Sequence, residues 1–174
     1  MDIVILYGTT EGQTRKIAET VAAQLRDLGH GVRLIDTADK RTAPDRSGAD
    51  RVILAAPVHE RRHPEAFEIT LTAAKDALAA RPTLMLSVSL KAAFPEGQEE
   101  AEDYLIEMKM RTGLDPSAEM LVAGAVRPGS YDYFQSQIVR HVALNGQDVA
   151  LSDGVQEFTD WPALAERVEA FVQS

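Results

Sequence analysis

The residues best suited to chemistry near the N-terminus lie in one short loop, between an apolar run and a stretch with helical periodicity. The loop consists of Gly8, Thr9, Thr10, Glu11, Gly12, Gln13 and Thr14. Hydroxyl groups, glycine backbone and the free amides at a helix start together favour the binding of a phosphate group. We therefore expect a phosphate site here. The alternative is an ordinary strand-to-helix turn, in which the same residue types are common.

This loop differs from two common nucleotide-binding motifs. It lacks the lysine of a P-loop, and its glycines do not have G-x-G-x-x-G spacing. Its residue order instead resembles the phosphate loop of the flavodoxins. The resemblance implies that FMN is the cofactor and that its phosphate contacts Thr9, Thr10, Glu11, Gly12, Gln13 and Thr14. Electron-carrier flavodoxins usually have Thr or Ser in place of Glu11, so we expect this carboxylate to turn outward and only its backbone amide to contribute.

Two further polar loops follow apolar runs, at residues 56–63 and 89–94. The flavodoxin resemblance implies that both hold the isoalloxazine ring of FMN. The expected contacts are Pro57, Val58, His59, Glu60, Arg61, Ser89, Leu90, Lys91 and Ala92. Neither loop contains Trp or Tyr, which leaves His59 and Phe94 as candidates to stack on the ring.

The charges in these two loops also bear on the chemistry. Arg61, Arg62 and Lys91 outnumber Glu60, and nearby cations favour the two-electron reduced, anionic flavin. We therefore expect a two-electron dehydrogenase or reductase rather than an electron carrier. The alternative for the arginines is a solvated surface run.

The first of these loops contains His59-Glu60-Arg61-Arg62-His63, an H-E-x-x-H string typical of zinc proteases. That chemistry requires a helix, because only a helix turns both histidines towards one metal ion. Here the string directly follows an apolar run, and Pro64 disfavours helical geometry at His63. We expect a polar loop and no metal site.

Apolar runs alternate with helical stretches along the chain, a pattern that predicts a doubly wound α/β fold. Strands are expected at Asp2–Tyr7, Gly31–Ile35, Arg51–Ala56, Thr83–Val88 and Met120–Val126. Helices are expected at Gln13–Leu28, Pro64–Ala79, Gln98–Thr112 and Trp161–Val172, with a short crossover at Asp45–Gly48. We predict a flavodoxin-like parallel sheet of five strands in the order 2-1-3-4-5, with helices on both faces. In such a sheet, ligands bind beyond the carboxyl ends of the strands.

Length and composition limit the remaining possibilities. A chain of 174 residues is expected to form one FMN-binding domain, spanning residues 1–174. The net charge of −9 argues against nucleic acid as a partner, and the absence of cysteine excludes thiol chemistry. No signal peptide or long apolar run is evident, so we expect a cytoplasmic protein with at most peripheral contact at the inner face of a membrane. Association into homo-oligomers stays open.

A long segment separates the fifth expected strand from the last helix, and we interpret residues 127–155 as an insert. Three motifs frame this region: Glu11-Gly12-Gln13-Thr14, Gly124-Ala125-Val126-Arg127 and Thr159-Asp160-Trp161. With them the chain resembles the menaquinone-dependent protoporphyrinogen dehydrogenase family of bacterial haem synthesis. The resemblance implies that a porphyrinogen gives a hydride to FMN, that a quinone reoxidises the flavin, and that cations such as Arg127 pair with the propionates.

We take as tentative substrate contacts Arg62, Arg127, Tyr131 and Tyr133. The tyrosines could instead simply anchor the insert on the sheet. No catalytic side chain is assigned, because the flavin itself accepts the hydride. An accompanying proton could be accepted near neutral pH by His59, His63 or His141. Two alternatives stay open: a flavodoxin-like quinone reductase or electron carrier, and a non-catalytic module that binds a phosphate group or no ligand.

Overall fold

A computed structural model describes residues 1–40, 48–126, 150–152 and 155–174. Its main sheet contains the parallel strands β1 (Asp2–Tyr7), β2 (Gly31–Asp36), β3 (Arg51–Pro57), β4 (Thr83–Ser89) and β5 (Ala118–Ala123). Their spatial order is β2-β1-β3-β4-β5, which confirms the predicted fold. Two predicted features lie wholly or mainly outside the described residues: the Asp45–Gly48 crossover and most of the 127–155 insert, with Arg127, Tyr131, Tyr133 and His141.

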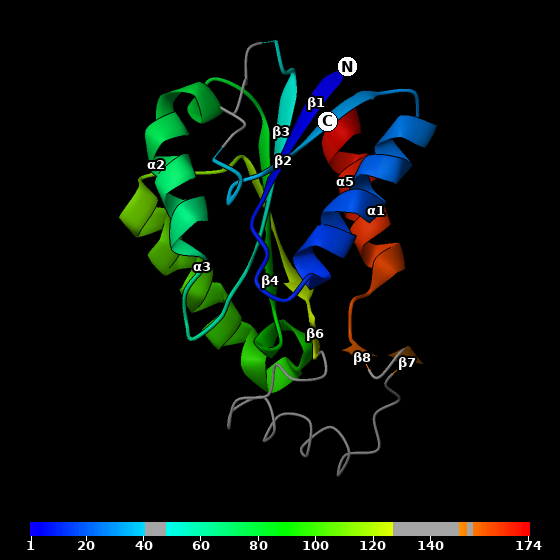
Figure 1. The fold of residues 1–174 in the computed structure, drawn as a ribbon, viewed down its shortest axis with the longest axis vertical. Helices are drawn as coiled ribbons and strands as arrows, with labels where there is room; N and C mark the ends of the chain where they lie inside the picture. Colours follow the sequence, from blue (N-terminus) through cyan, green and yellow to red (C-terminus); the bar gives the residue numbers. More distant parts are fainter. Residues whose placement is uncertain (41–47, 127–149, 153–154) are drawn as a thin grey trace.

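Helices cover both faces of this sheet (Figure 1). One face carries α1 (Gln13–Asp27) and α5 (Trp161–Gln173), and the other carries α2 (Glu65–Ala79) and α3 (Gln98–Thr112). Their bounds differ from the predicted ones by at most one residue. Asp160 caps α5 by accepting a hydrogen bond from the amide of Ala163 at 3.1 Å, and Pro162 occupies the first turn, where a missing N–H costs little.

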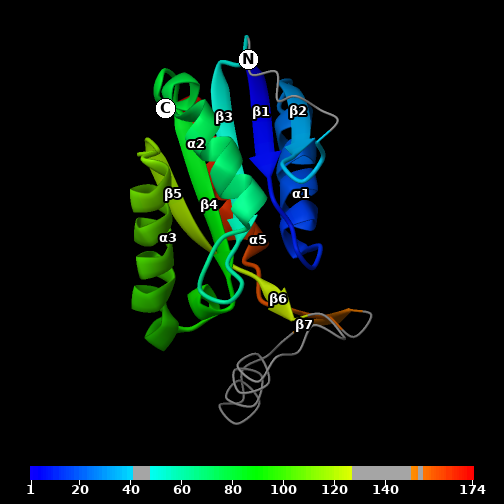
Figure 2. The same ribbon diagram turned by 60° about the vertical axis from the view of Figure 1, so that its left-hand side comes forward.

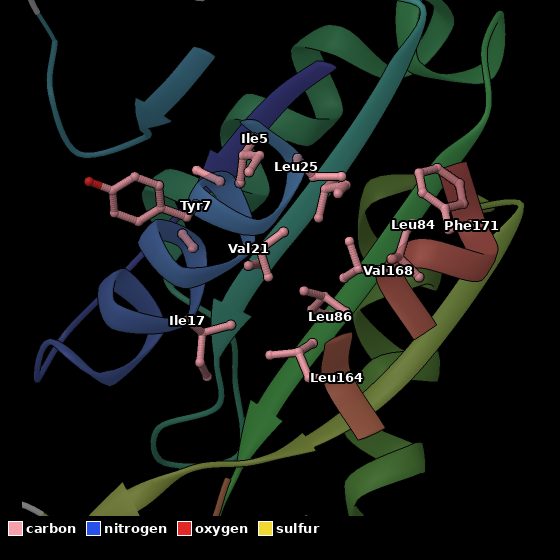
Figure 3. Packing of buried hydrophobic residues seen from close by; sticks show 14 of the residues in the cluster. Ile5, Tyr7, Ile17, Val21, Leu25, Leu84, Leu86, Leu164, Val168 and Phe171 are labelled. Carbon is pink, nitrogen blue, oxygen red and sulfur yellow. The ribbon is translucent and has the colours of Figure 1, made fainter. Parts of the chain in front are cut away.

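Alternating side chains of each strand pack on opposite faces, as the pleat requires. On the face of α1 and α5, Ile5 meets Val21 and Leu25 of α1, while Leu84 and Phe171 pack in the same cluster (Figure 3). On the other face, the fully buried side chains belong to a second cluster with α2 and α3, including Val4, Leu6, Leu54, Phe67, Leu71 and Met108. Each such side chain stabilises the fold by roughly 1.5–3 kcal/mol. The two clusters hold the sheet as a rigid base for the loops at its edge.

The expected fifth strand, Met120–Val126, is in fact two strands. β5 ends at Ala123, and β6 (Ala125–Val126) pairs antiparallel with β8 (Val155–Glu157), which also pairs with β7 (Ala150–Ser152) (Figure 2). Gly124 lies at the break. Its amide donates to the carbonyl of Ser89 at 3.1 Å, while its own carbonyl accepts from Phe158 at 3.0 Å. The chain therefore leaves the main sheet at Gly124, as glycine within a strand often indicates.

This small β6–β8–β7 sheet lies beyond the carboxyl ends of the main strands (Figure 2). It is built from the two flanks of the predicted insert. In the part of the chain that the structure describes, no helix is both long enough and apolar enough to span a membrane.

Candidate functional site

A cavity of about 480 Å³, here called the main cavity, opens beyond the carboxyl ends of β1, β3 and β4. Its volume lies within the range of roughly 300–1,000 Å³ that is usual for small-molecule sites. The structure brings most of the predicted cofactor contacts together in its lining, namely Thr9, Thr10, Glu11, Gln13, Thr14, Pro57, Val58, His59, Glu60, Arg61, Ser89, Leu90 and Lys91. Three separate loops therefore meet where the sheet topology predicts.

Three predicted contacts lie elsewhere. Gly12 and Ala92 do not line the main cavity, although both belong to loops that do. The amide of Ala92 donates to Ser89 Oγ at 3.2 Å, so it is used within its own turn. Arg62 lines a separate depression between α2 and α3, together with Glu65, Glu68 and Arg111.

One end of the main cavity is formed by the loop that leads into α1. Gly12 precedes the helix with φ of 98°, a left-handed conformation that glycine adopts without strain, and it offers no side chain to cap the helix. Its amide donates to Thr9 Oγ1 at 2.9 Å, which closes the loop. The first amides of a helix lack partners within the helix and favour an anion.

Thr14 completes this end of the cavity. It is almost wholly buried, yet it lines the cavity, and its Oγ1 has no hydrogen-bond partner among the described residues. A buried hydroxyl without a partner is costly, and an anion at the helix start would satisfy it. The residues present therefore fit a phosphate-bearing ligand.

Gln13 serves this loop differently from its neighbours. Its backbone begins α1, but its side-chain amide donates to Glu157 Oε2 and to Thr159 Oγ1, both at 3.1 Å. The side chain is therefore committed to the segment before α5. Sequence alone gave no sign of this contact, because the partners lie more than a hundred residues apart.

Glu11 does not turn outward as expected. Its carboxylate lines the main cavity, and Oε1 lies 4.0 Å from Nδ1 of His59. The side chain is only 21% exposed. A negative charge therefore remains in the cavity near the helix start, where it faces the turn that follows β3.

That turn contains the H-E-x-x-H string, and it is not helical. The amides and carbonyls of His59 and Arg62 exchange hydrogen bonds of 2.9 and 3.1 Å. Glu60 and Arg61 both have positive φ, 49° and 69°, which is unusual for side chains other than glycine. The tight turn gives the two histidines different surroundings, so the string lacks the geometry of a zinc protease.

The expectation that His63 accepts a proton near neutral pH is wrong. His63 is buried on the α2 side of the sheet, and its Nε2 lies 2.9 Å from Ser87 Oγ. Burial, with a smaller contribution from Arg111, lowers the pKa of His63 to about 4. The side chain is therefore neutral at pH 7 and lies outside the main cavity, whereas His59 lines it.

The opposite wall of the main cavity includes residues that sequence reasoning missed. They are Val88, Glu100, Tyr104, Gly124 and Ala125. Glu100 and Tyr104 come from α3, which does not follow a strand end directly, and no local pattern indicated that they reach the site. Gly124 and Ala125 were recognised only as part of a family motif.

Glu100 is the centre of a charged cluster in this wall. Its carboxylate lies 2.9 Å from Lys91 Nζ and 3.9 Å from Arg61 Nη1, and it accepts a hydrogen bond from the Tyr104 hydroxyl. Hydrogen bonds from Tyr104 and Lys91 lower the pKa of Glu100. Burial, followed by the hydrogen bond to Glu100, raises the pKa of Tyr104.

This cluster changes the expected electrostatics. Three acidic residues, Glu11, Glu60 and Glu100, line the main cavity, together with the cationic residues Arg61 and Lys91. The predicted cationic excess is therefore wrong, because Glu100 was not counted and Arg62 lies elsewhere.

The aromatic expectations also change. Phe94 is buried against Phe158, with the ring centroids 5.7 Å apart in an edge-to-face arrangement, and it does not line the cavity. Tyr104 provides an aromatic ring in the wall instead, with the Arg61 guanidinium 5.7 Å from its centroid.

The turn that carries Lys91 is fixed by close backbone packing. Lys91–Ala93 form a 3-10 turn, η1, followed by a second, η2 (Pro95–Gly97). A Cβ atom at Gly97 would lie 2.2 Å from the carbonyl oxygen of Lys91, so only glycine fits there. Lys91 is therefore held towards Glu100 and the cavity.

Comparison with known proteins agrees with this architecture. The flavodoxin domain family matches residues 4–149. The chain is 26% identical over 167 residues to "Protoporphyrinogen IX dehydrogenase [quinone]" of Escherichia coli strain K12, covering 95% of this chain and 91% of that protein.

Two solved structures show the same fold at low identity. A flavodoxin variant from Pseudomonas aeruginosa has a TM-score of 0.57 and 13% identity, with 99% of both chains covered. A flavodoxin from Fusobacterium nucleatum bound to flavin mononucleotide has a TM-score of 0.52 and 13% identity, covering 99% of this chain and 95% of that one. Together with the family match, the second structure supports FMN as the expected cofactor. This chain belongs to the flavodoxin domain family.

Proposed function

We propose that the protein binds FMN in the main cavity and acts as a two-electron oxidoreductase of the protoporphyrinogen dehydrogenase type. The observation that carries the cofactor assignment is the buried, unpartnered hydroxyl of Thr14 at the start of α1, in the lining of the cavity. A phosphate at this helix start would accept hydrogen bonds from that hydroxyl and from backbone amides. Family membership supports a flavin-linked redox role.

The side chains of the main cavity would hold and orient the cofactor. Thr9 closes the loop around the phosphate, while Pro57, Val58 and Leu90 offer apolar surface to the ring. Bound FMN supplies the hydride- and electron-accepting chemistry. His59 lines the cavity and is the described residue best placed to take up a proton released with the hydride.

The substrate assignment rests on the relative from Escherichia coli, whose name gives both a porphyrinogen and a quinone. By this proposal a porphyrinogen would give a hydride from a methylene bridge to bound FMN and a proton from a neighbouring position to a base, and a quinone would take up two electrons and two protons to become the quinol. Similarity along nearly the whole chain supports this reading. The tentative substrate residues Arg127, Tyr131 and Tyr133 lie outside the described residues, so their roles stay predictions.

The experiment is a visible absorption titration of the purified protein with FMN, followed by anaerobic mixing with protoporphyrinogen IX. A perturbed flavin spectrum that bleaches on mixing would support the proposal. Thr14→Val should shift the titration to higher FMN concentration, whereas Thr20→Val should not, because the Thr20 hydroxyl bonds to the Lys16 carbonyl on the exposed face of α1. Bound flavin that never bleaches would contradict the substrate assignment and leave the cofactor assignment intact.

A second candidate is a quinone reductase or electron carrier with an unrelated donor. Acidic residues outnumber basic ones in the cavity lining, and this favours the second candidate because negative charge opposes the anionic reduced flavin. The aromatic ring of Tyr104 in the lining also favours this candidate. This candidate predicts that a chemically reduced protein transfers electrons to quinone or a redox protein but does not turn over porphyrinogen. A protein that retains no flavin would instead point to a non-catalytic module.

A further inference from the structure

The Glu157 carboxylate joins three donors from two helices. Its Oε2 accepts hydrogen bonds from Gln13 Nε2 at 3.1 Å and from Lys16 Nζ at 2.7 Å. Its Oε1 accepts from Trp161 Nε1 at 2.7 Å. The side chain is only 16% exposed, although it stands at the end of the short strand β8.

The same contacts lock the first turn of α1. Gln13 and Lys16 are one turn apart and both meet Glu157, so the helix is held on one side by a single carboxylate. Gln13 also donates to Thr159 Oγ1, and that hydroxyl donates to the Ala123 carbonyl at 2.7 Å, where β5 ends. This turn of α1 is thereby tied to β5, β8 and the start of α5.

The hydrogen bonds to the Glu157 carboxylate favour its ionised form. Burial raises the pKa of Glu157, but hydrogen bonds from Lys16, Trp161 and Gln13 outweigh burial and hold the pKa below its usual value. Lys16 Nζ also lies 5.4 Å from the centroid of the Trp161 ring. Its position is therefore restricted from two sides.

Of the residues in this network, only Gln13 lines the main cavity. Glu157, Lys16, Thr159 and Trp161 do not line the main cavity, whereas Gln13, the residue they hold, does. The amides of this turn bind a phosphate only if the helix start points at it, and such precision comes from residues behind the site.

We propose that Glu157 is a positioning residue that aims the first turn of α1 at the phosphate of FMN and thereby couples the small β6–β8–β7 sheet to cofactor binding. This inference rests on the proposed function, because it takes FMN as the ligand. By this inference, Glu157 contributes to the binding of the phosphate although it lies outside the cavity.

The test compares FMN with riboflavin, which lacks the phosphate. Glu157→Gln keeps the shape of the side chain, but both carboxylate oxygens face N–H donors, so either orientation of the new amide places its NH₂ group against a donor. We expect the ratio of FMN affinity to riboflavin affinity to fall about tenfold in this variant, from misdirected charge-assisted hydrogen bonds.

Two further variants make the result specific. Lys16→Met removes the cation of the pair at a half-exposed position, and it should lower the same ratio even if Glu157→Gln does not fold. Glu119→Gln breaks an ion pair of similar length, to Lys109 Nζ at 2.6 Å, near the start of β5, away from the cavity. It should leave the ratio unchanged.

An unchanged ratio in both Glu157→Gln and Lys16→Met, or an equal fall in Glu119→Gln, would overturn the positioning role while leaving the proposed function standing. Equal losses of FMN and riboflavin affinity would also overturn it, because they indicate general loosening. If the unaltered protein bound no FMN, the proposed function would fail and this inference with it.

Discussion

The two ends of the main cavity are built in different ways. The end proposed to hold the phosphate, here called the phosphate end, comes from one continuous segment, residues 9–14, in which backbone and hydroxyl groups would be the donors. The rest of the lining, proposed to hold the ring and here called the ring end, is assembled from several segments: residues 57–61, residues 88–91, Glu100 and Tyr104 on α3, and Gly124 with Ala125. By this proposal, phosphate binding is encoded locally, whereas the electrostatic surroundings of the ring depend on tertiary packing.

The two ends also differ in charge. At the phosphate end the helix start is positive, with Glu11 as the opposing charge. At the ring end the charges of Glu60 and Glu100 balance those of Lys91 and Arg61, which would otherwise favour the reduced, anionic flavin. Substitutions at the first end should therefore change affinity, and substitutions at the second end should change redox potential.

The largest effect is expected from removing both hydroxyls at the phosphate end. Thr9→Ala with Thr14→Ala should weaken FMN binding by about 4 kcal/mol, because two charge-assisted hydrogen bonds are lost. Loss of the Thr9 contact to the Gly12 amide would also loosen the loop. Fluorescence quenching of FMN measures the affinity.

The matched control is Thr20→Ala with Thr70→Ala. Both hydroxyls bond to carbonyls of their own helices, Lys16 at 2.8 Å and Ala66 at 2.9 Å, and neither residue lines the cavity. Similar losses of affinity in the two double variants would contradict the assignment of the phosphate end.

The next effect separates the two histidines near the ring end, His59 in the cavity and His63 in the core. The pKa of His63 is about 4 in the folded protein, below its ordinary value of 6.5. Between pH 6.5 and pH 4, His63 is therefore protonated in the unfolded chain but neutral in the folded protein. Stability is fully present above pH 6.5 and falls by about 3 kcal/mol as the pH drops to 4.

His63→Gln keeps a polar group that can hydrogen-bond to Ser87 but removes this titration. In urea unfolding, the stability of the unaltered protein relative to this variant should decline by that amount from pH 7 to pH 4. His59→Gln, at the exposed rim, serves as the control. A constant difference between the unaltered protein and His63→Gln would show that His63 is not buried as described.

A smaller effect, an increase in FMN affinity, should come from removing the negative charge of Glu11 at the phosphate end. Glu11→Thr removes a carboxylate from the cavity lining, so FMN should bind more tightly by about 1 kcal/mol at low salt. Glu19→Thr, on the exposed face of α1, should have no effect. Weaker binding in Glu11→Thr would mean that the pair with His59 supports the cofactor more than its charge opposes it.

The smallest effect belongs to the ring end. Glu100→Gln removes the carboxylate that pairs with Lys91 and Arg61, so the two-electron potential of bound FMN should rise, by about 10–20 mV because the cluster is partly exposed. Redox titration against reference dyes measures this shift. Glu102→Gln, exposed on the same helix, should not move the potential. A fall in the potential of Glu100→Gln would contradict the proposed electrostatics.

The sequence was sufficient for the fold because periodicity and loop chemistry agree along β1 to β4. It also predicted that the loop before α1 lines the cavity, since the functional groups there are neighbours in the chain. It failed for Phe94, which lies in a predicted ring loop but packs against Phe158 more than sixty residues away. No local signal marks such a contact.

The same reason explains why Glu100 was missed. Its i, i+4 partner Tyr104 is visible in the sequence, but their reach over the cavity depends on how α3 packs against β4 and on the turn held by Gly97. The break at Gly124 could have been predicted, because glycine inside a strand often marks a bend.

The most direct measurement is calorimetric titration of the flavin-free protein with FMN and, separately, with riboflavin. The two ligands differ only in the phosphate, so the ratio of their affinities measures how much the phosphate contributes to binding. If residues 9–14 hold the phosphate, FMN should bind at least about 100-fold more tightly than riboflavin. Equal affinities would contradict this central claim.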